Sequence, residues 1–121
     1  MTTFTKIFGK EASPLLIRKY TFLGMPVYVA IITDEDVSDI DEVVLNVLRP
    51  WRDKGISSFS EVRELVTELQ TTLSKVYERA EGIAIVCFPD KACVSSLWGD
   101  FMNHQMCRDE LYNLINIMVK I

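Results

Sequence analysis

A chain of 121 residues with 49% apolar and 25% charged residues has the composition of one globular domain, so residues 1–121 are expected to form a single core. The net charge of −4, with basic residues scattered along the chain, disfavours binding to nucleic acid or to a membrane surface. No apolar run approaches the ~20 residues that cross a bilayer, and three cysteines without an export signal predict a cytoplasmic location.

Three β-rich runs are predicted first along the chain. Residues 4–8 have the pattern of a short strand. Residues 15–23 and 26–33 are predicted to form a hairpin, because Gly24 between them supplies the positive φ that a tight turn needs. The run at 26–33 is apolar on both faces, which indicates a central strand.

Two amphipathic helices are predicted next. The first begins at Ser38, which can act as its N-cap, and ends early at Pro50, because proline restricts the residue before it. The second begins with a capping box from Ser58 to Glu61 and ends at Gly82. Its apolar residues recur at helical spacing over about five turns.

A further apolar strand is predicted at 82–88, and the chain after residue 91 has a helical pattern with a bend or break at Gly99. The last helix carries its apolar residues between 111 and 119. The predicted order is therefore β-β-β-α-α-β-α(α), an α/β (α+β) fold in which helices pack on a four-stranded mixed sheet. The two most apolar strands are expected to be neighbours at the centre of that sheet.

Six carboxylates between Asp34 and Glu42 follow directly on a predicted central strand. Sites in open α/β sheets gather at the carboxyl ends of strands, and carboxylates there can hold Mg²⁺ together with phosphate. Asp34 and Asp36 are therefore candidate metal ligands, joined by Asp90 if the two apolar strands are parallel neighbours. The chemistry would be phosphoryl transfer or hydrolysis. A Gly-rich phosphate loop is missing, and acids are common in a first helical turn, so a solvated helix N-terminus is the simpler interpretation.

All three cysteines and the only histidine lie within residues 87–107. Cys93, His104 and Cys107 are candidates for a zinc site, or for a thiol nucleophile with a histidine base. Both hypotheses require the chain to fold back at Gly99, because Cys93 and His104 stand ~16 Å apart along one continuous helix. Buried cysteines commonly have no ligand role, and a chain of this length forms a core without a metal, so no cofactor is expected.

Aromatic and methionine residues favour a binding function. Trp51 lies in a predicted loop among charges, and Trp98, Met102 and Met106 form a stripe at helical spacing. These residue types are enriched at interface cores, and so apolar a helix must be buried on two sides or face a partner.

We therefore expect a small acidic protein–protein interaction module, such as an adaptor, inhibitor, chaperone or immunity-type protein, that is non-enzymatic and forms a homodimer. The Mg²⁺-dependent phosphate-handling enzyme is the alternative hypothesis. The thiol or zinc site is the third.

Overall fold

The computed structural model describes residues 15–90 and 92–99, which form a four-stranded sheet and two helices of the α+β class. The elements follow in the order β1 (Leu15–Phe22), β2 (Met25–Ile32), α2 (Ile40–Lys54), α3 (Phe59–Val76), β3 (Gly82–Cys87) and β4 (Val94–Gly99). The predicted strand at 4–8 and the predicted helices after residue 99 lie outside the described residues.

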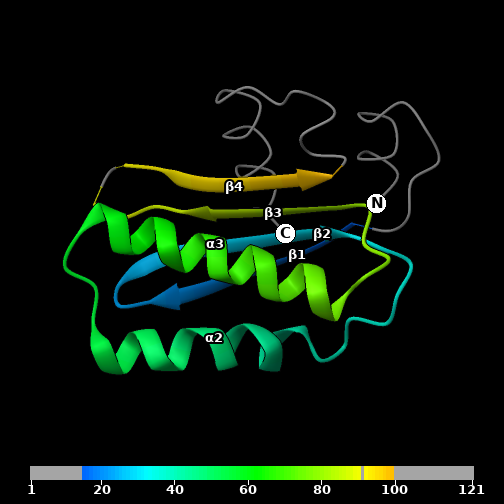
Figure 1. Ribbon diagram of the computed structural model, residues 1–121, viewed down its shortest axis with the longest axis horizontal. Helices are drawn as coiled ribbons and strands as arrows, with labels where there is room; N and C mark the ends of the chain where they lie inside the picture. Colours follow the sequence, from blue (N-terminus) through cyan, green and yellow to red (C-terminus); the bar gives the residue numbers. More distant parts are fainter. Residues whose placement is uncertain (1–14, 91, 100–121) are drawn as a thin grey trace.

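The strands stand in the order β1-β2-β3-β4, and each is antiparallel to its neighbour. The prediction of a mixed sheet is therefore wrong for the described strands. The reason is the number of helices between β2 and β3. α2 carries the chain back along the sheet and α3 returns it to the end where β2 finished, so β3 must start there and run in the opposite direction (Figure 1). The predicted central position of the two apolar strands is confirmed.

The predicted hairpin is present, with its turn one residue earlier than expected. Phe22 pairs with Met25, so the turn consists of Leu23 and Gly24, whose φ angles are 50° and 76°. Positive φ at both turn residues is the requirement of the type I′ turn, which matches the right-handed twist of paired strands. Gly24 satisfies this requirement without strain, whereas Leu23 does not.

Helix α2 continues through Pro50 to Lys54, so the predicted end at Pro50 is wrong. An interior proline costs about 3 kcal/mol, but the extra turn buries the large ring of Trp51, which is 9% exposed. The predicted N-cap is also displaced by one residue, because Asp39 precedes the helix in place of Ser38. Tertiary packing therefore decides the C-terminal end of this helix.

Helix α3 begins as predicted. Ser58 is its N-cap, and the Ser58 hydroxyl accepts a hydrogen bond from the backbone N–H of Glu61 at 3.3 Å. The Glu61 carboxylate accepts in return from the backbone N–H and the hydroxyl of Ser57, at 3.2 and 2.8 Å. Among the described residues, no helix is both long and apolar enough to cross a membrane.

Residues 94–99 form a strand, so the helix predicted there is wrong. Val94 and Trp98 pair with Cys87 and Ile83 of β3, and their side chains therefore point to the same face of the sheet. The pairing with β3 identifies the strand, because two residues four apart share a face in a helix as well. The strand ends at Gly99, where φ is 68° and a Cβ atom would collide with the backbone.

Both helices cover one face of the sheet, with α3 along β3 and β4 and α2 beside α3 (Figure 1). The core between these layers comes from β2, α2, α3 and β3, and its fully buried residues include Val27, Val29, Ile31, Val44, Leu65, Leu69, Leu73, Ile83 and Ile85. The opposite face of the sheet is apolar too, with the side chains of Tyr28, Ala30, Ile32, Ala84 and Val86 buried. β2 and β3 are thus apolar on both faces, as predicted for a central strand.

Candidate functional site

The acidic residues after β2 are engaged in local structure. Asp34 forms an ion pair with Arg79 at 3.4 Å, and the carboxylate of Glu35 accepts a hydrogen bond from the Arg79 backbone N–H at 2.7 Å. The Asp36 carboxylate accepts from the backbone N–H of Ser38 at 3.0 Å, and this bond lowers the pKa of Asp36. The loop that enters α2 is therefore tied to the segment that follows α3.

The acids at the start of α2 bind tyrosines. The Tyr77 hydroxyl donates to Asp39 at 2.6 Å, and the Tyr20 hydroxyl donates to Asp41 at 2.7 Å. Burial, and then these hydrogen bonds to carboxylates, raise the pKa of both phenols. Tyr20 comes from β1 and Tyr77 follows α3, so both carboxylates hold α2 in place on its neighbours.

The geometry does not bring the three predicted metal ligands together. Asp34 and Asp36 follow the end of β2, whereas Asp90 follows the end of β3, which is antiparallel to β2. The 6 residues of β3 separate the two ends by about 20 Å. The parallel arrangement that Asp90 required is therefore not met. Within residues 15–90 and 92–99, no group of three or more potential metal-binding side chains converges.

The thiol or zinc hypothesis falls mostly outside the described residues, because His104 and Cys107 belong to the segment after residue 99. Cys93 is half-buried and directly precedes β4. Cys87 faces the helix-covered core, and this burial raises the pKa of its thiol to about 12. A thiol so far from ionisation at neutral pH has the character of a packing residue.

The two tryptophans lie in different surroundings. Trp51 belongs to α2 and not to a loop, its ring is buried, and its indole N–H donates to the carboxylate of Glu68 on α3. Trp98 lies on β4, and 39% of its surface is exposed. Met102 and Met106 lie outside the described residues. Of the predicted partner-binding residues that the structure describes, only Trp98 therefore offers an aromatic surface.

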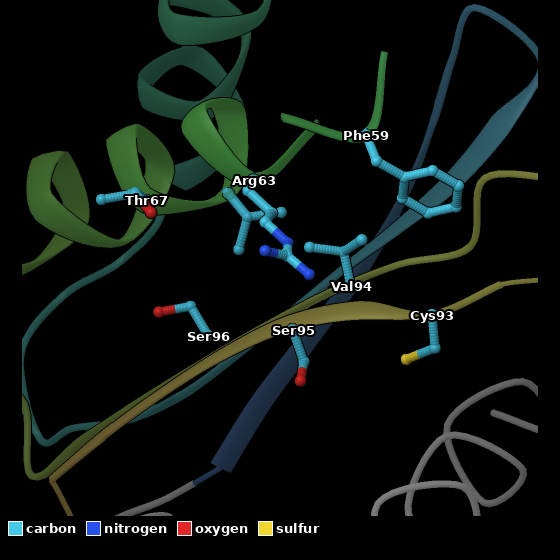
Figure 2. Close-up of a pocket in the computed structure, with 8 residues that line it drawn as sticks. Phe59, Arg63, Thr67, Cys93, Val94, Ser95 and Ser96 are labelled. Carbon is cyan, nitrogen blue, oxygen red and sulfur yellow. The ribbon is translucent and has the colours of Figure 1, made fainter. Parts of the chain in front are cut away.

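A pocket of about 460 Å³ lies between α3 and β4 (Figure 2). We call it the α3–β4 groove, and its lining residues are Phe59, Arg63, Val66, Thr67, Cys93, Val94, Ser95 and Ser96. The helical residues recur at intervals of three and four, which places them on the side of α3 that faces β4. On the strand, Val94 and Ser96 point toward α3, and Ser95 between them points away (Figure 2).

β4 stands at the edge of the described sheet. It pairs with β3 on one side, and none of the other described strands pairs with its second side. The Ser96 hydroxyl donates to the side-chain oxygen of Gln70 at 2.7 Å, which fixes the strand to α3. An edge strand presents unpaired backbone N–H and C=O groups to any chain that approaches it. The groove therefore lies directly beside a row of backbone hydrogen-bonding groups.

Arg63 sets the charge of the groove. Among the described side chains that line the pocket, it is the charged one, and none of them is a carboxylate. Its guanidinium projects from α3 toward β4 (Figure 2) and forms no hydrogen bond or ion pair with the described residues. In a chain with a net charge of −4, the groove is thus a local positive site.

Reasoning from the sequence missed this site. Phe59 and Arg63 belong to the polar side of an amphipathic helix, where such residues carry no signal of function. Ser95 and Ser96 were placed in a predicted helix. Residues 94–98, Val-Ser-Ser-Leu-Trp, do not alternate apolar and polar residues, so their pattern carries no signal of a strand. Nothing in the sequence pairs that strand with α3 either.

Comparisons with known proteins add no name to this site. A scan against protein-family models found no match, and a search of curated proteins found none either.

Proposed function

We propose that this protein is a protein–protein interaction module that binds an extended segment of another protein along the outer edge of β4. The observation that carries the proposal is the α3–β4 groove, which opens beside the edge of β4 that pairs with none of the other described strands. Strand addition at a sheet edge is a recurring mode of peptide recognition, in which backbone hydrogen bonds supply affinity and pockets beside the edge supply specificity.

The groove is large enough to receive side chains of a bound segment. Ligand pockets in proteins measure roughly 300–1,000 Å³, and the groove measures about 460 Å³. In an added strand, alternate side chains point to the same face of the sheet. Every second side chain of the bound segment would therefore enter the groove between β4 and α3, while its backbone bonds to β4.

The exposed aromatic surface at the two ends of β4 supports a protein as the partner. Phe59 is 52% exposed at the end where β4 begins, and Trp98 is 39% exposed near the end where it stops. Exposed aromatic side chains beside a polar edge are typical of interfaces between proteins. The proposed module is non-enzymatic, and the cytoplasmic location remains a prediction from the cysteine content.

Paired proline variants test the role of the edge. Successive N–H groups of a strand point in opposite directions, so one of Ser95 and Ser96 directs its N–H to β3 and the other to the open edge. Proline is tolerated where the N–H points outward. Of Ser95→Pro and Ser96→Pro, we expect one to keep the unfolding temperature of the chain, and we call it the edge-blocking variant.

Peptides selected from a display library of random dodecapeptides on the full chain are the probe. We expect these peptides to bind the edge-blocking variant about tenfold more weakly, because an intermolecular backbone hydrogen bond is lost. In the unaltered chain, a bound peptide should also slow hydrogen exchange at alternate amides of β4. This measurement does not depend on the proline variants, so it still tests the proposal if both variants unfold. Equal binding to the edge-blocking variant, or unchanged exchange in β4, contradicts the proposal.

A further inference from the structure

Resting on the proposed function, we infer that the α3–β4 groove selects segments in which alternate residues are apolar, acidic and apolar. The acidic side chain binds Arg63, and the two apolar side chains contact Phe59 and Trp98. The inference names the chemistry of the partner at the same site, and three features of the groove support it.

The first feature is the spacing of the strand residues. Val94, Ser96 and Trp98 pair with Cys87, Ile85 and Ile83, whose side chains belong to the helix-covered core. All three strand residues therefore face the helix side of the sheet, with steps of about 7 Å between them. A strand added beside β4 repeats this spacing, so three of its consecutive same-face side chains lie beside Val94 and Ser96 in the groove and beside Trp98 beyond it.

The second feature is the position of Arg63 between the two aromatic residues. Phe59 lies one helical turn before Arg63, and both line the pocket with Val94. The guanidinium of Arg63 lies over β4, near Val94 and Ser96 (Figure 2). Trp98 follows two residues after Ser96 on the same face of β4. Phe59 and Arg63 thus line the groove, and Trp98 lies beyond it on the same face of β4, in the order aromatic, cationic, aromatic.

The third feature is the lack of an internal partner for this cation. Arg63 is exposed and forms no ion pair with the described residues, and none of the described residues that line the pocket carries a carboxylate. A guanidinium binds a carboxylate through two parallel hydrogen bonds, which are stronger than bonds between neutral groups. An aspartate or glutamate at the central position complements the groove, and a lysine or arginine there is repelled.

Charge reversal at Arg63 tests the inference. We expect the dodecapeptide library to yield, on the full chain, peptides with aspartate or glutamate flanked at two-residue spacing by apolar residues. On Arg63→Glu, the same selection should yield lysine or arginine at the central position. Peptides selected on the full chain should bind Arg63→Glu about 10- to 100-fold more weakly, because a hydrogen bond between charged groups is replaced by repulsion.

Arg49→Glu is the matched control. Arg49 is an exposed arginine on α2, outside the groove, so the same change of charge there should leave the acidic preference and the affinity unchanged. If Arg49→Glu alters the preference as much as Arg63→Glu does, net charge explains the selection and the inference is wrong.

The outcomes separate this inference from the function on which it rests. Peptides that require the β4 edge but show no acidic preference, or keep that preference on Arg63→Glu, overturn the inference and leave the proposed function intact. Peptides that bind the edge-blocking variant as well as the full chain overturn both. A library that yields no peptides on the folded chain also overturns both.

Discussion

Gly24 and Gly99 share a left-handed backbone, but their surroundings differ. Their φ angles are 76° and 68°, values that non-glycine residues adopt with strain. A Cβ atom at Gly24 would have no atom within 4 Å, whereas one at Gly99 would collide with the carbonyl of Glu81. The same substitution at these positions therefore separates the cost of backbone strain from the cost of a steric clash.

Gly99→Ala is predicted to destabilise the protein by about 3 kcal/mol, because the backbone must move where β4 approaches β3. Gly24→Ala, the control, should cost about 1 kcal/mol from φ alone. Urea unfolding followed by circular dichroism measures both free energies. Equal losses in the two variants would show that the close approach of Gly99 to Glu81 adds nothing to the cost.

The start of α3 illustrates what a short element can specify by itself. Ser58 and Glu61 lie three residues apart. The Ser58 hydroxyl accepts a hydrogen bond from the backbone N–H of Glu61, and the Glu61 carboxylate accepts one from the backbone N–H of Ser57. Such a motif needs no distant residue, so the sequence was sufficient to locate it. The C-terminal end of α2 differs in this respect, because the burial of Trp51 overrides the local preference of Pro50.

Acid should weaken the α3 cap. Hydrogen bonds from Ser57 lower the pKa of Glu61 below its ordinary value of 4.5. A carboxylate with a depressed folded pKa contributes stability above that ordinary value and loses it as the pH falls through the folded pKa. Glu61→Gln should therefore lower the urea midpoint at neutral pH and make no difference once the pH lies well below the folded pKa.

The control for this prediction is Glu64→Gln, an exposed glutamate on the same helix for which no hydrogen bond to a described residue is found. Its urea midpoint should follow that of the unaltered chain over the whole pH range. If Glu61→Gln follows it as well, the Glu61 carboxylate has no role in the cap.

The whole molecule presents two contrasting ends along the sheet. One end carries the acids that tie the loop after β2 to the segment after α3, and the other carries the hairpin turn, the start of α3 and the opening of the groove. The proposed occupant of the β4 edge is a segment of another protein. The homodimer predicted from the sequence remains a prediction, and a second copy on β4 is the competing occupant.

Light scattering after size-exclusion chromatography distinguishes these occupants. We expect the edge-blocking variant to keep the molar mass of the unaltered chain, because no second copy uses the β4 edge. Arg49→Glu serves as a control for changes in column behaviour, since it alters the surface away from the groove. A dimer that dissociates only in the edge-blocking variant would place a second copy on β4.

Local patterns determined the hairpin, the two described helices and the apolar β2 and β3, because turn chemistry, capping and periodicity act between residues close in the chain. They failed at β4, where a short run with Val94 and Trp98 fits either period by composition. They failed again at the end of α2. Pro50 predicts that the helix ends there, whereas the burial of the Trp51 ring extends the helix to Lys54.

The direction of β3, the edge position of β4 and the α3–β4 groove were decided by tertiary structure. Each depends on contacts between segments far apart in the chain, and such contacts produce no hydrophobic periodicity in either segment. Arg63 makes the point most clearly. In the sequence it is one charged residue on the polar side of a helix, and its place above β4 arises only when the returning strand packs against α3.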